Sequence, residues 1–392
     1  MKLFICSLIC TLLSLNLWAQ QSFDITGTVK DENGAALQSV TVFIDGSNKY
    51  TMTDVSGHYT FAAIQPGTYR VATSMVGRGS ERLMVILSNK SVKADLVMKP
   101  KPIELNEVVI GTDSRRNEML RIFTNKFLGV TENAQSCTII NPKIIEFTTN
   151  KGILLATTPD FLIIENKNLG YRIKYLLKVF RYDRAFNLTS YTGDCIFEDL
   201  PGSTRQKKKW IENRRAAYQG SFMHFLRSLY SGNTREQGFK CYAFIDSAKT
   251  PTVSDQLVDM SQYVTRIDSN FIRLAFTKKF KVTHNSTKAL LVKAGSQLPE
   301  EITKLLGDTN KTGKSNDRIT LLRPKSERER RLMTPASFRA SHWDNDAGIV
   351  KLYLNFTIVD RNGNYLDYRS FLLEDLWSEL QVGDRLPFTY QP

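Results

Sequence analysis

The chain has 392 residues, with 53 lysines and arginines against 39 acidic residues and a formal net charge of +14 at pH 7. This length is that of two or three ordinary domains and argues against a single one. Two of the five cysteines, Cys6 and Cys10, lie at the very start of the chain, and the other three are widely spaced, which is the pattern of neither a disulfide framework nor a Cys-x-x-Cys metal clip.

The first nineteen residues have the pattern of an export signal. Lys2 gives a positive end, an apolar run extends from Leu3 to Leu17, and Ala19 is a small residue suited to cleavage. Polar residues interrupt this run, and it is short for a bilayer span, which disfavours the alternative of a retained membrane anchor. We therefore interpret residues 1–19 as a signal peptide and predict an exported protein of the periplasm or the outer-membrane periphery.

Residues 20–99 have the pattern of a small β-sandwich. Val40, Val42 and Ile44 recur at every second position, as in a half-buried strand. Turns that contain Asp or Asn followed by Gly separate the predicted strands, and Gly57 closes one of them. We expect seven strands, the last two at 80–87 and 91–98, and a positive φ at Gly57.

The same residues carry a family resemblance. The turn Thr53-Asp54-x-x-Gly57-x-Tyr59 and the segment Pro66-Gly67-x-Tyr69-x-Val71 look like those of the carboxypeptidase regulatory-like domain, which is common in exported Bacteroidetes proteins. The resemblance covers nearly all of residues 22–99 and implies a transthyretin-like sandwich. It also implies a module that binds or orients a partner.

A linker and a larger region follow the sandwich. Pro100 and Pro102 stop strand pairing, so residues 100–112 are a predicted linker. They resemble the segment after the same module in TonB-dependent transporters, but the rest of this chain is too short for a transporter barrel. Residues 113–392 are a predicted α+β region, with a candidate division near 324–335. This region resembles the long C-terminal part of Bacteroidetes regulatory-domain proteins that have no assigned activity. The resemblance is carried by the segments Phe127-Leu128-Gly129, Asn141-Pro142, Asn168-Leu169-Gly170-Tyr171, Ala217-Tyr218-x-Gly220-Ser221 and His224-Phe225-Leu226-Arg227.

Antiparallel sheets and helices are expected within residues 113–392, which makes the whole chain mainly β. Strand 171–180 should place Ile173, Tyr175, Leu177 and Val179 on one face. The other expected strands are 187–197 in a hairpin with it, 240–245, 271–276, 279–284, 317–322, and a long C-terminal hairpin of 349–360 with 365–373. Expected helices are 114–127, 205–217, 222–230 with Ser221 as cap, and 298–306.

The motifs of known catalytic sites are missing from the sequence. A zinc carboxypeptidase needs a His-x-x-Glu pair, but the residues three positions after the four histidines are Phe61, Arg227, Thr287 and Asn345. Phosphate-loop, dinucleotide and Gly-x-Ser-x-Gly fingerprints are also missing. We therefore predict no cofactor, no metal and no catalytic residue.

Three weaker constellations have ordinary structural interpretations. Ser221 and His224 lie one helical turn apart, and we favour a helix cap over a nucleophile and base. A polar turn is favoured over a cation site for His342, Asp344 and Asp346. Buried structural thiols are favoured over a nucleophile for the cysteines of the mature chain, which are Cys137, Cys195 and Cys241.

A basic helix supplies the only candidate site. Three successive lysines cannot all be buried, and Trp210 can anchor the helix beneath them. The predicted partner-binding residues are Arg205, Lys207, Lys208, Lys209, Arg214 and Arg215. For an exported chain the expected partner is an anionic glycan, a membrane surface or an acidic envelope protein, and not nucleic acid. A solvated helix without a partner is the competing interpretation. The competing function is a hydrolase of an envelope or dietary polymer, with an unfamiliar site in residues 113–392.

Overall fold

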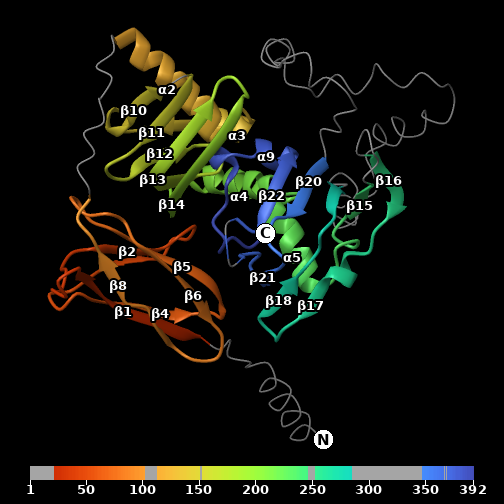
Figure 1. Cartoon of the computed structure of the whole chain (residues 1–392), viewed down its shortest axis with the longest axis horizontal. Coiled ribbons are helices and arrows are strands. Elements are labelled where there is room, and N and C mark those ends of the chain that lie inside the picture. The colour runs from red at the N-terminus through yellow and green to blue at the C-terminus, as the bar shows by residue number, and fades with distance from the viewer. Residues whose placement is uncertain are drawn as a thin grey trace, which may run out of the picture.

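The computed structural model describes residues 22–101, 113–150, 152–245, 252–284, 347–365, 367 and 369–392. The predicted signal peptide, most of the predicted linker, the helix at 298–306, the strand at 317–322, the division near 324–335 and the His342 turn lie outside these ranges. The described chain is mainly β with few helices, so the predicted fold class is confirmed (Figure 1). No helix in the described ranges has the length and apolar content that crossing a membrane requires.

Two four-stranded sheets form the N-terminal sandwich (Figure 1). The first sheet joins β4 (His58–Ile64), β1 (Phe23–Asp31), β7 (Val92–Lys93) and β8 (Leu96–Met98). The second has the order β3 (Tyr50–Met52), β2 (Thr41–Ile44), β5 (Gly67–Ser74) and β6 (Arg82–Leu87). Gly57 has a φ of 75°, and a Cβ there would lie 2.5 Å from the carbonyl oxygen of Val29, so the predicted turn is confirmed.

The last predicted strand of the sandwich is divided in two. Both β7 and β8 pair with β1, and both run parallel to it. Asp95 lies between them, and its carboxylate accepts hydrogen bonds from the backbone N–H of Thr28 at 2.8 Å and from the Thr28 hydroxyl at 3.0 Å. The Asp95 side chain therefore accepts the Thr28 N–H that a backbone carbonyl would accept in an unbroken strand pair. The sandwich has eight strands where the sequence pattern predicted seven.

The middle region is a six-stranded sheet covered by a helix. Its order is β10 (Glu146–Asn150), β11 (Ile153–Thr157), β13 (Tyr171–Asp183), β12 (Leu162–Asn166) and β9 (Cys137–Ile139), and β14 (Leu188–Asp199) also pairs with β13. Helix α2 (Asp113–Leu128) buries Phe123 and Phe127 against this sheet, where they contact Phe180. The short helix α3 (Glu132–Gln135) and a 3₁₀ turn at Pro142–Ile144 complete the region.

A β-bulge corrects one detail of the sequence prediction. The register of β13 against β14 shifts between Leu177 and Val179. One extra residue moves the following side chains to the opposite face of a strand. Val179 is consequently 40% exposed, and Phe180 is buried in its place. The predicted position of Val179 on the buried face is therefore wrong.

The third region contains two smaller sheets and the helix α5 (Phe222–Ser231). One sheet has the order β16 (Thr252–Leu257), β15 (Phe239–Ile245), β19 (Lys279–His284), β20 (Ala347–Leu352) and β22 (Phe371–Asp375). The other contains β17 (Val264–Arg266), β18 (Phe271–Leu274) and β21 (Thr357–Asp360), and a 3₁₀ turn at Met260–Tyr263 precedes it. The predicted C-terminal hairpin is confirmed in part: β20 pairs antiparallel with β22, and Val359 bridges Tyr365 beside the turn, but the first arm is interrupted and its second half, β21, pairs with β18.

The C-terminal segment connects all three regions. This segment contains α9 (Leu376–Glu379) and a 3₁₀ turn at Val382–Asp384. Val382 packs in the core of the middle region, and Phe388 packs in the core of the sandwich. Arg227 of α5 donates hydrogen bonds to the carbonyl oxygens of Phe388 and Tyr390, each at 2.8 Å. In Figure 1 the C-terminus accordingly lies between the sandwich and the two other regions. The C-terminal segment therefore holds the sandwich against the middle and third regions.

Candidate binding surface and domain junction

The predicted basic helix is α4 (Thr204–Tyr218). Ser203 and Gln206 form a capping box, in which the Ser203 hydroxyl accepts from the Gln206 N–H and the Gln206 side chain accepts from the Ser203 N–H. Trp210 and Tyr218 are buried on its inner face. The indole N–H of Trp210 donates to the carbonyl oxygen of Lys167 at 2.9 Å, which fixes the helix against the middle sheet.

Two glycines make room for the Trp210 ring. A Cβ at Gly170 would lie 2.1 Å from the ring, and one at Gly202 would lie 2.5 Å from it. Gly170 also has a φ of 69°, which favours glycine. The helix can therefore approach the sheet closely only because both positions lack a side chain.

Five of the six predicted partner-binding residues are exposed on α4. These are Arg205, Lys207, Lys208, Lys209 and Arg215, which we call the basic face. None of the five forms an ion pair with a residue that the structure describes. Their charges are therefore available to a partner, although the structure shows none.

Arg214 does not belong to this face. Its guanidinium donates to the carbonyl oxygens of Leu169 and Gly170, pairs with Asp199 at 2.7 Å and lies 3.6 Å from the centre of the Tyr171 ring. Only 14% of its side chain is exposed. It lies four residues after Trp210 and hence on the same inner face of the helix. Arg214 is a packing residue, which corrects the predicted set.

A pocket adjoins the basic face where α4 meets the middle sheet. Its volume is about 430 Å³. Lys209 contributes to it from the helix, and Arg172, from β13, forms a 2.7 Å ion pair with Glu165 within it. Cations, amides and apolar carbons all line the pocket, in the residues Glu165, Lys167, Asn168, Arg172, Leu200, Pro201, Gln206, Lys209 and Trp210. Such a lining can pair an anion and hydrogen-bond to hydroxyl groups at the same time.

The weaker catalytic candidates have structural roles. The Ser221 hydroxyl accepts from the backbone N–H of His224, as a helix cap does. The His224 ring packs against Tyr218 and Phe239, and its Nδ1 accepts from the N–H of Gly220. The predicted cap is therefore confirmed.

The three cysteines that the structure describes are free thiols with little access to solvent. Cys195 and Cys241 are buried, and Cys137 is half-buried. Burial raises the pKa of Cys137 and of Cys241 to about 12 in each case, and it raises the pKa of Cys195 further. A thiolate nucleophile needs a lowered pKa instead, so these groups fit the predicted structural role. Among the described residues, no group of three or more His, Cys, Asp or Glu side chains is placed to hold a metal ion.

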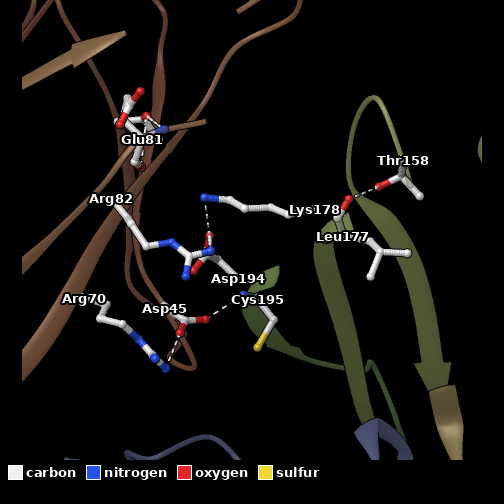
Figure 2. A network of polar contacts seen from close by, with 10 residues as sticks. Asp45, Arg70, Glu81, Arg82, Thr158, Leu177, Lys178, Asp194 and Cys195 are labelled. Atoms are coloured by element: carbon white, nitrogen blue, oxygen red, sulfur yellow. Dashed lines mark hydrogen bonds and ion pairs between the residues drawn. The ribbon is translucent and has the colours of Figure 1, made fainter. Parts of the chain in front are cut away.

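A network of charged side chains lies between the sandwich and the middle sheet (Figure 2). Asp45 of the sandwich pairs with Arg70 at 2.7 Å and accepts the backbone N–H of Cys195 at 2.7 Å. Asp194 of β14 pairs with Arg82 of the sandwich at 3.1 Å and with Lys178 at 3.4 Å. One ion pair, Arg82–Asp194, and one hydrogen bond, from the Cys195 N–H to Asp45, therefore cross the junction.

Asp194 is the most deeply buried member of this network, with 1% of its side chain exposed. Burial raises its pKa, and the nearby Asp45 carboxylate raises it further, whereas Arg82 and Lys178 act in the opposite direction. A raised carboxyl pKa is also a property of catalytic acids. Here substrate could not reach the group, so the arrangement fits a fixed domain contact better than catalysis.

Backbone and apolar contacts extend the same junction. The N–H of Gly46 donates to the carbonyl oxygen of Cys195, and the N–H of Phe197 donates to that of Ser47, each at 2.8 Å. A small apolar cluster of Phe43, Ala72, Leu176 and Ile196 covers one outer face of the sandwich. That face is thus occupied by the chain itself.

A second contact joins the sandwich to the third region. The Asp360 carboxylate, which is fully buried, accepts the N–H of Thr68 at 2.9 Å across the junction and the N–H groups of Asn362 and Asn364 within its own turn. Burial raises the pKa of Asp360. The sequence signalled the turn at 360–363, but not its partner on the sandwich.

Comparison with known proteins identifies the N-terminal domain. Residues 25–110 match the CarboxypepD_reg-like domain family, which confirms the predicted resemblance. No curated protein matches the chain.

Several solved structures match parts of the chain at low similarity. A 3-chlorocatechol 1,2-dioxygenase from Rhodococcus opacus 1CP is 11% identical, with a TM-score of 0.17, and the match covers 22% of this chain and 62% of the enzyme. A type II cohesin–X-dockerin complex from Acetivibrio cellulolyticus is 15% identical over 25% of this chain and 72% of its own, with a TM-score of 0.19. A protein of unknown function from Bacteroides fragilis NCTC 9343 is 10% identical over 67% of this chain and 90% of its own, with a TM-score of 0.17. The chain spans less than two thirds of the dioxygenase, and TM-scores this low support no functional inference.

Proposed function

We propose that this protein is an exported, non-catalytic component of the cell envelope that binds an anionic glycan through the basic face of α4. The observation that carries the proposal is the set of five exposed cations on one helix, none of them paired with a described carboxylate. Unpaired like charges repel one another, and an anionic polymer that lies along the helix would relieve this repulsion.

The adjoining pocket favours a glycan over an acidic protein. Lys209 belongs to both the basic face and the pocket, so one charged saccharide unit could contact both. Gln206 and Asn168 offer hydrogen-bonding groups suited to sugar hydroxyls, and Leu200 and Pro201 offer apolar carbon for the face of a sugar ring. In this proposal, the CarboxypepD_reg-like sandwich serves as a scaffold that is fixed to the binding region through the Arg82–Asp194 ion pair and the hydrogen bond from the Cys195 N–H to Asp45.

Neutralising the lysines tests the proposal. The variant Lys207→Gln, Lys208→Gln and Lys209→Gln is compared with the wild type for binding to polygalacturonate, with neutral dextran as the polymer control. A protein control with the same net charge replaces three exposed lysines of the sandwich, Lys30, Lys49 and Lys90, by glutamine.

We expect wild-type binding to weaken steeply with added salt, since charges are screened over about 8 Å at physiological ionic strength. The α4 variant should lose most of the affinity and most of its salt dependence, while the sandwich variant should keep both. Equal losses in the two variants would show a nonspecific effect of net charge and contradict the proposed site. Binding to polyglutamate as tight as to polygalacturonate would indicate an acidic protein partner instead.

The export part of the proposal has its own test. N-terminal sequencing of the protein from its native host should find a mature chain that begins near Gln20, in the periplasmic or peripheral membrane fraction. A mature chain that retains Met1 would contradict it.

A further inference from the structure

The pocket between α4 and the middle sheet has a charge balance of its own. Arg172 and Glu165 neutralise each other through their 2.7 Å ion pair. Lys167 and Lys209 also line the pocket, and neither forms an ion pair with a residue that the structure describes. The net positive charge of the pocket is therefore that of the two lysines, and a bound acidic group would be their partner.

The two lysines reach the pocket from different elements that are fixed to each other. Lys209 belongs to α4, and Lys167 directly follows β12. The carbonyl oxygen of Lys167 accepts the indole N–H of Trp210, the residue next to Lys209, at 2.9 Å. This hydrogen bond holds the backbones of both lysines beside the pocket. One acidic group of a ligand can consequently contact both ammonium groups.

The Glu165–Arg172 ion pair leaves one acceptor and one donor open. The two residues are cross-strand partners on β12 and β13. Nε and Nη2 of Arg172 both donate to the same oxygen, Oε1 of Glu165, at 3.2 and 2.7 Å. Among the described residues, neither Oε2 of Glu165 nor Nη1 of Arg172 has a hydrogen-bond partner. A carboxylate oxygen accepts and a guanidinium N–H donates, so the ion pair can bind two hydroxyl groups of one ligand.

The spacing of these groups limits the size of the unit that is recognised. Lys167 lies two residues after Glu165, and two residues of extended chain span about 7 Å. The pocket volume of about 430 Å³ is in the range of sites for one small ligand. The acidic group and the hydroxyl groups should therefore belong to the same sugar residue. A hexuronic acid residue has this pattern, with a carboxylate on one side of its ring and two adjacent hydroxyl groups on the other.

We propose that this pocket determines which anionic glycan the protein binds, by holding one hexuronic acid residue of the polymer. The sugar carboxylate pairs with Lys167 and Lys209. One of two adjacent hydroxyl groups donates to Oε2 of Glu165, and the other accepts from Nη1 of Arg172. This inference rests on the proposed function and adds to it the residues that select the sugar, whereas the other lysines of α4 attract any polyanion.

The test uses the full-length protein and two fluorescein-labelled oligogalacturonates. One oligomer is unmodified, and the other carries acetyl esters on its C2 and C3 hydroxyl groups and keeps every carboxylate. Fluorescence anisotropy gives the dissociation constant of each. The acetylated oligomer should bind the wild type about tenfold more weakly, because it loses hydrogen bonds to charged groups while its charge is unchanged.

Protein variants locate the selection in the pocket. In Glu165→Ala the ratio of the two dissociation constants should fall from about tenfold to near one, because the acceptor for the sugar hydroxyl is gone. Glu212→Ala is the matched control: it removes the same charge from an exposed position of α4 that does not line the pocket, so its ratio should equal that of the wild type. Lys167→Gln should weaken the binding of both oligomers by the same factor and keep the ratio.

The outcomes separate this inference from the proposed function. Equal affinities of the wild type for the two oligomers, or a ratio that Glu165→Ala and Glu212→Ala change equally, would overturn the inference. The proposed function would stand in both cases if the Lys207, Lys208 and Lys209 variant still loses affinity for the unmodified oligomer. The comparison of the two oligomers on the wild type decides the question even if Glu165→Ala fails to fold.

Discussion

Replacing Phe388 by alanine tests how firmly the C-terminal segment holds the sandwich. The Phe388 ring is 8% exposed in the sandwich core, and its centre lies 5.8 Å from that of the Tyr69 ring. Removing a buried phenylalanine ring typically costs about 3–5 kcal/mol. The backbone N–H of Phe388 still donates to the carbonyl oxygen of Gly46 in the variant, so we expect a loss near the lower end, about 3 kcal/mol.

Thermal and urea unfolding followed by circular dichroism measure this loss. Phe186→Ala is the matched control, because that ring is 81% exposed and its removal should change the stability by less than about 0.5 kcal/mol. If Phe388→Ala and Phe186→Ala shift the unfolding transition equally, the C-terminal segment does not complete the core of the sandwich. A loss confined to Phe388→Ala supports the packing described above.

Three other outcomes follow from the structure. Gly57→Val should lower the free energy of unfolding in urea by about 1–3 kcal/mol, which is more than Gly34→Val should lower it. Both positions have a positive φ, but only Gly57 lacks space for a Cβ, so equal losses would contradict this turn geometry. Asp194→Ala should destabilise the protein by about 2–3 kcal/mol in the same assay, because it leaves the partly exposed Arg82 and Lys178 without their shared partner; no change would show that the network adds nothing. A raised pKa means that the folded state holds the Asp360 proton more tightly than the unfolded state. The contribution of Asp360 to the free energy of unfolding is therefore complete below pH 3.8, the ordinary pKa of an aspartate, and is lost as the pH rises through the raised pKa of the folded state. This pH dependence should be missing from the unfolding of Asp360→Asn.

Local features of the fold could be predicted from the sequence. A turn that needs a glycine at Gly57, or a cap such as Ser221, depends on residues within one turn of each other, so the sequence pattern contains the needed information. The bulge at Leu177 to Val179 could not be predicted in this way, because it depends on pairing with β14. The interruption of the C-terminal hairpin could not be predicted for a similar reason, since β21 pairs with the distant β18.

The candidate site was predictable in part. Successive lysines indicated the exposed face of α4, but Arg214 was counted with them although its spacing of four from Trp210 indicated the inner face. The junction network was missed, because Arg82 and Asp194 are 112 residues apart and neither has a distinctive neighbour in sequence. Such ion pairs arise from the packing of whole domains.

The most direct test of the central claim is a lysine acetylation footprint of the full-length protein, read by mass spectrometry with and without polygalacturonate. The account predicts that the polymer protects Lys207, Lys208 and Lys209 from acetylation, and that Lys30 and Lys90 on the sandwich react equally in both conditions. Protection of the sandwich lysines with no change on α4 would contradict the claim that the basic face binds the anionic partner.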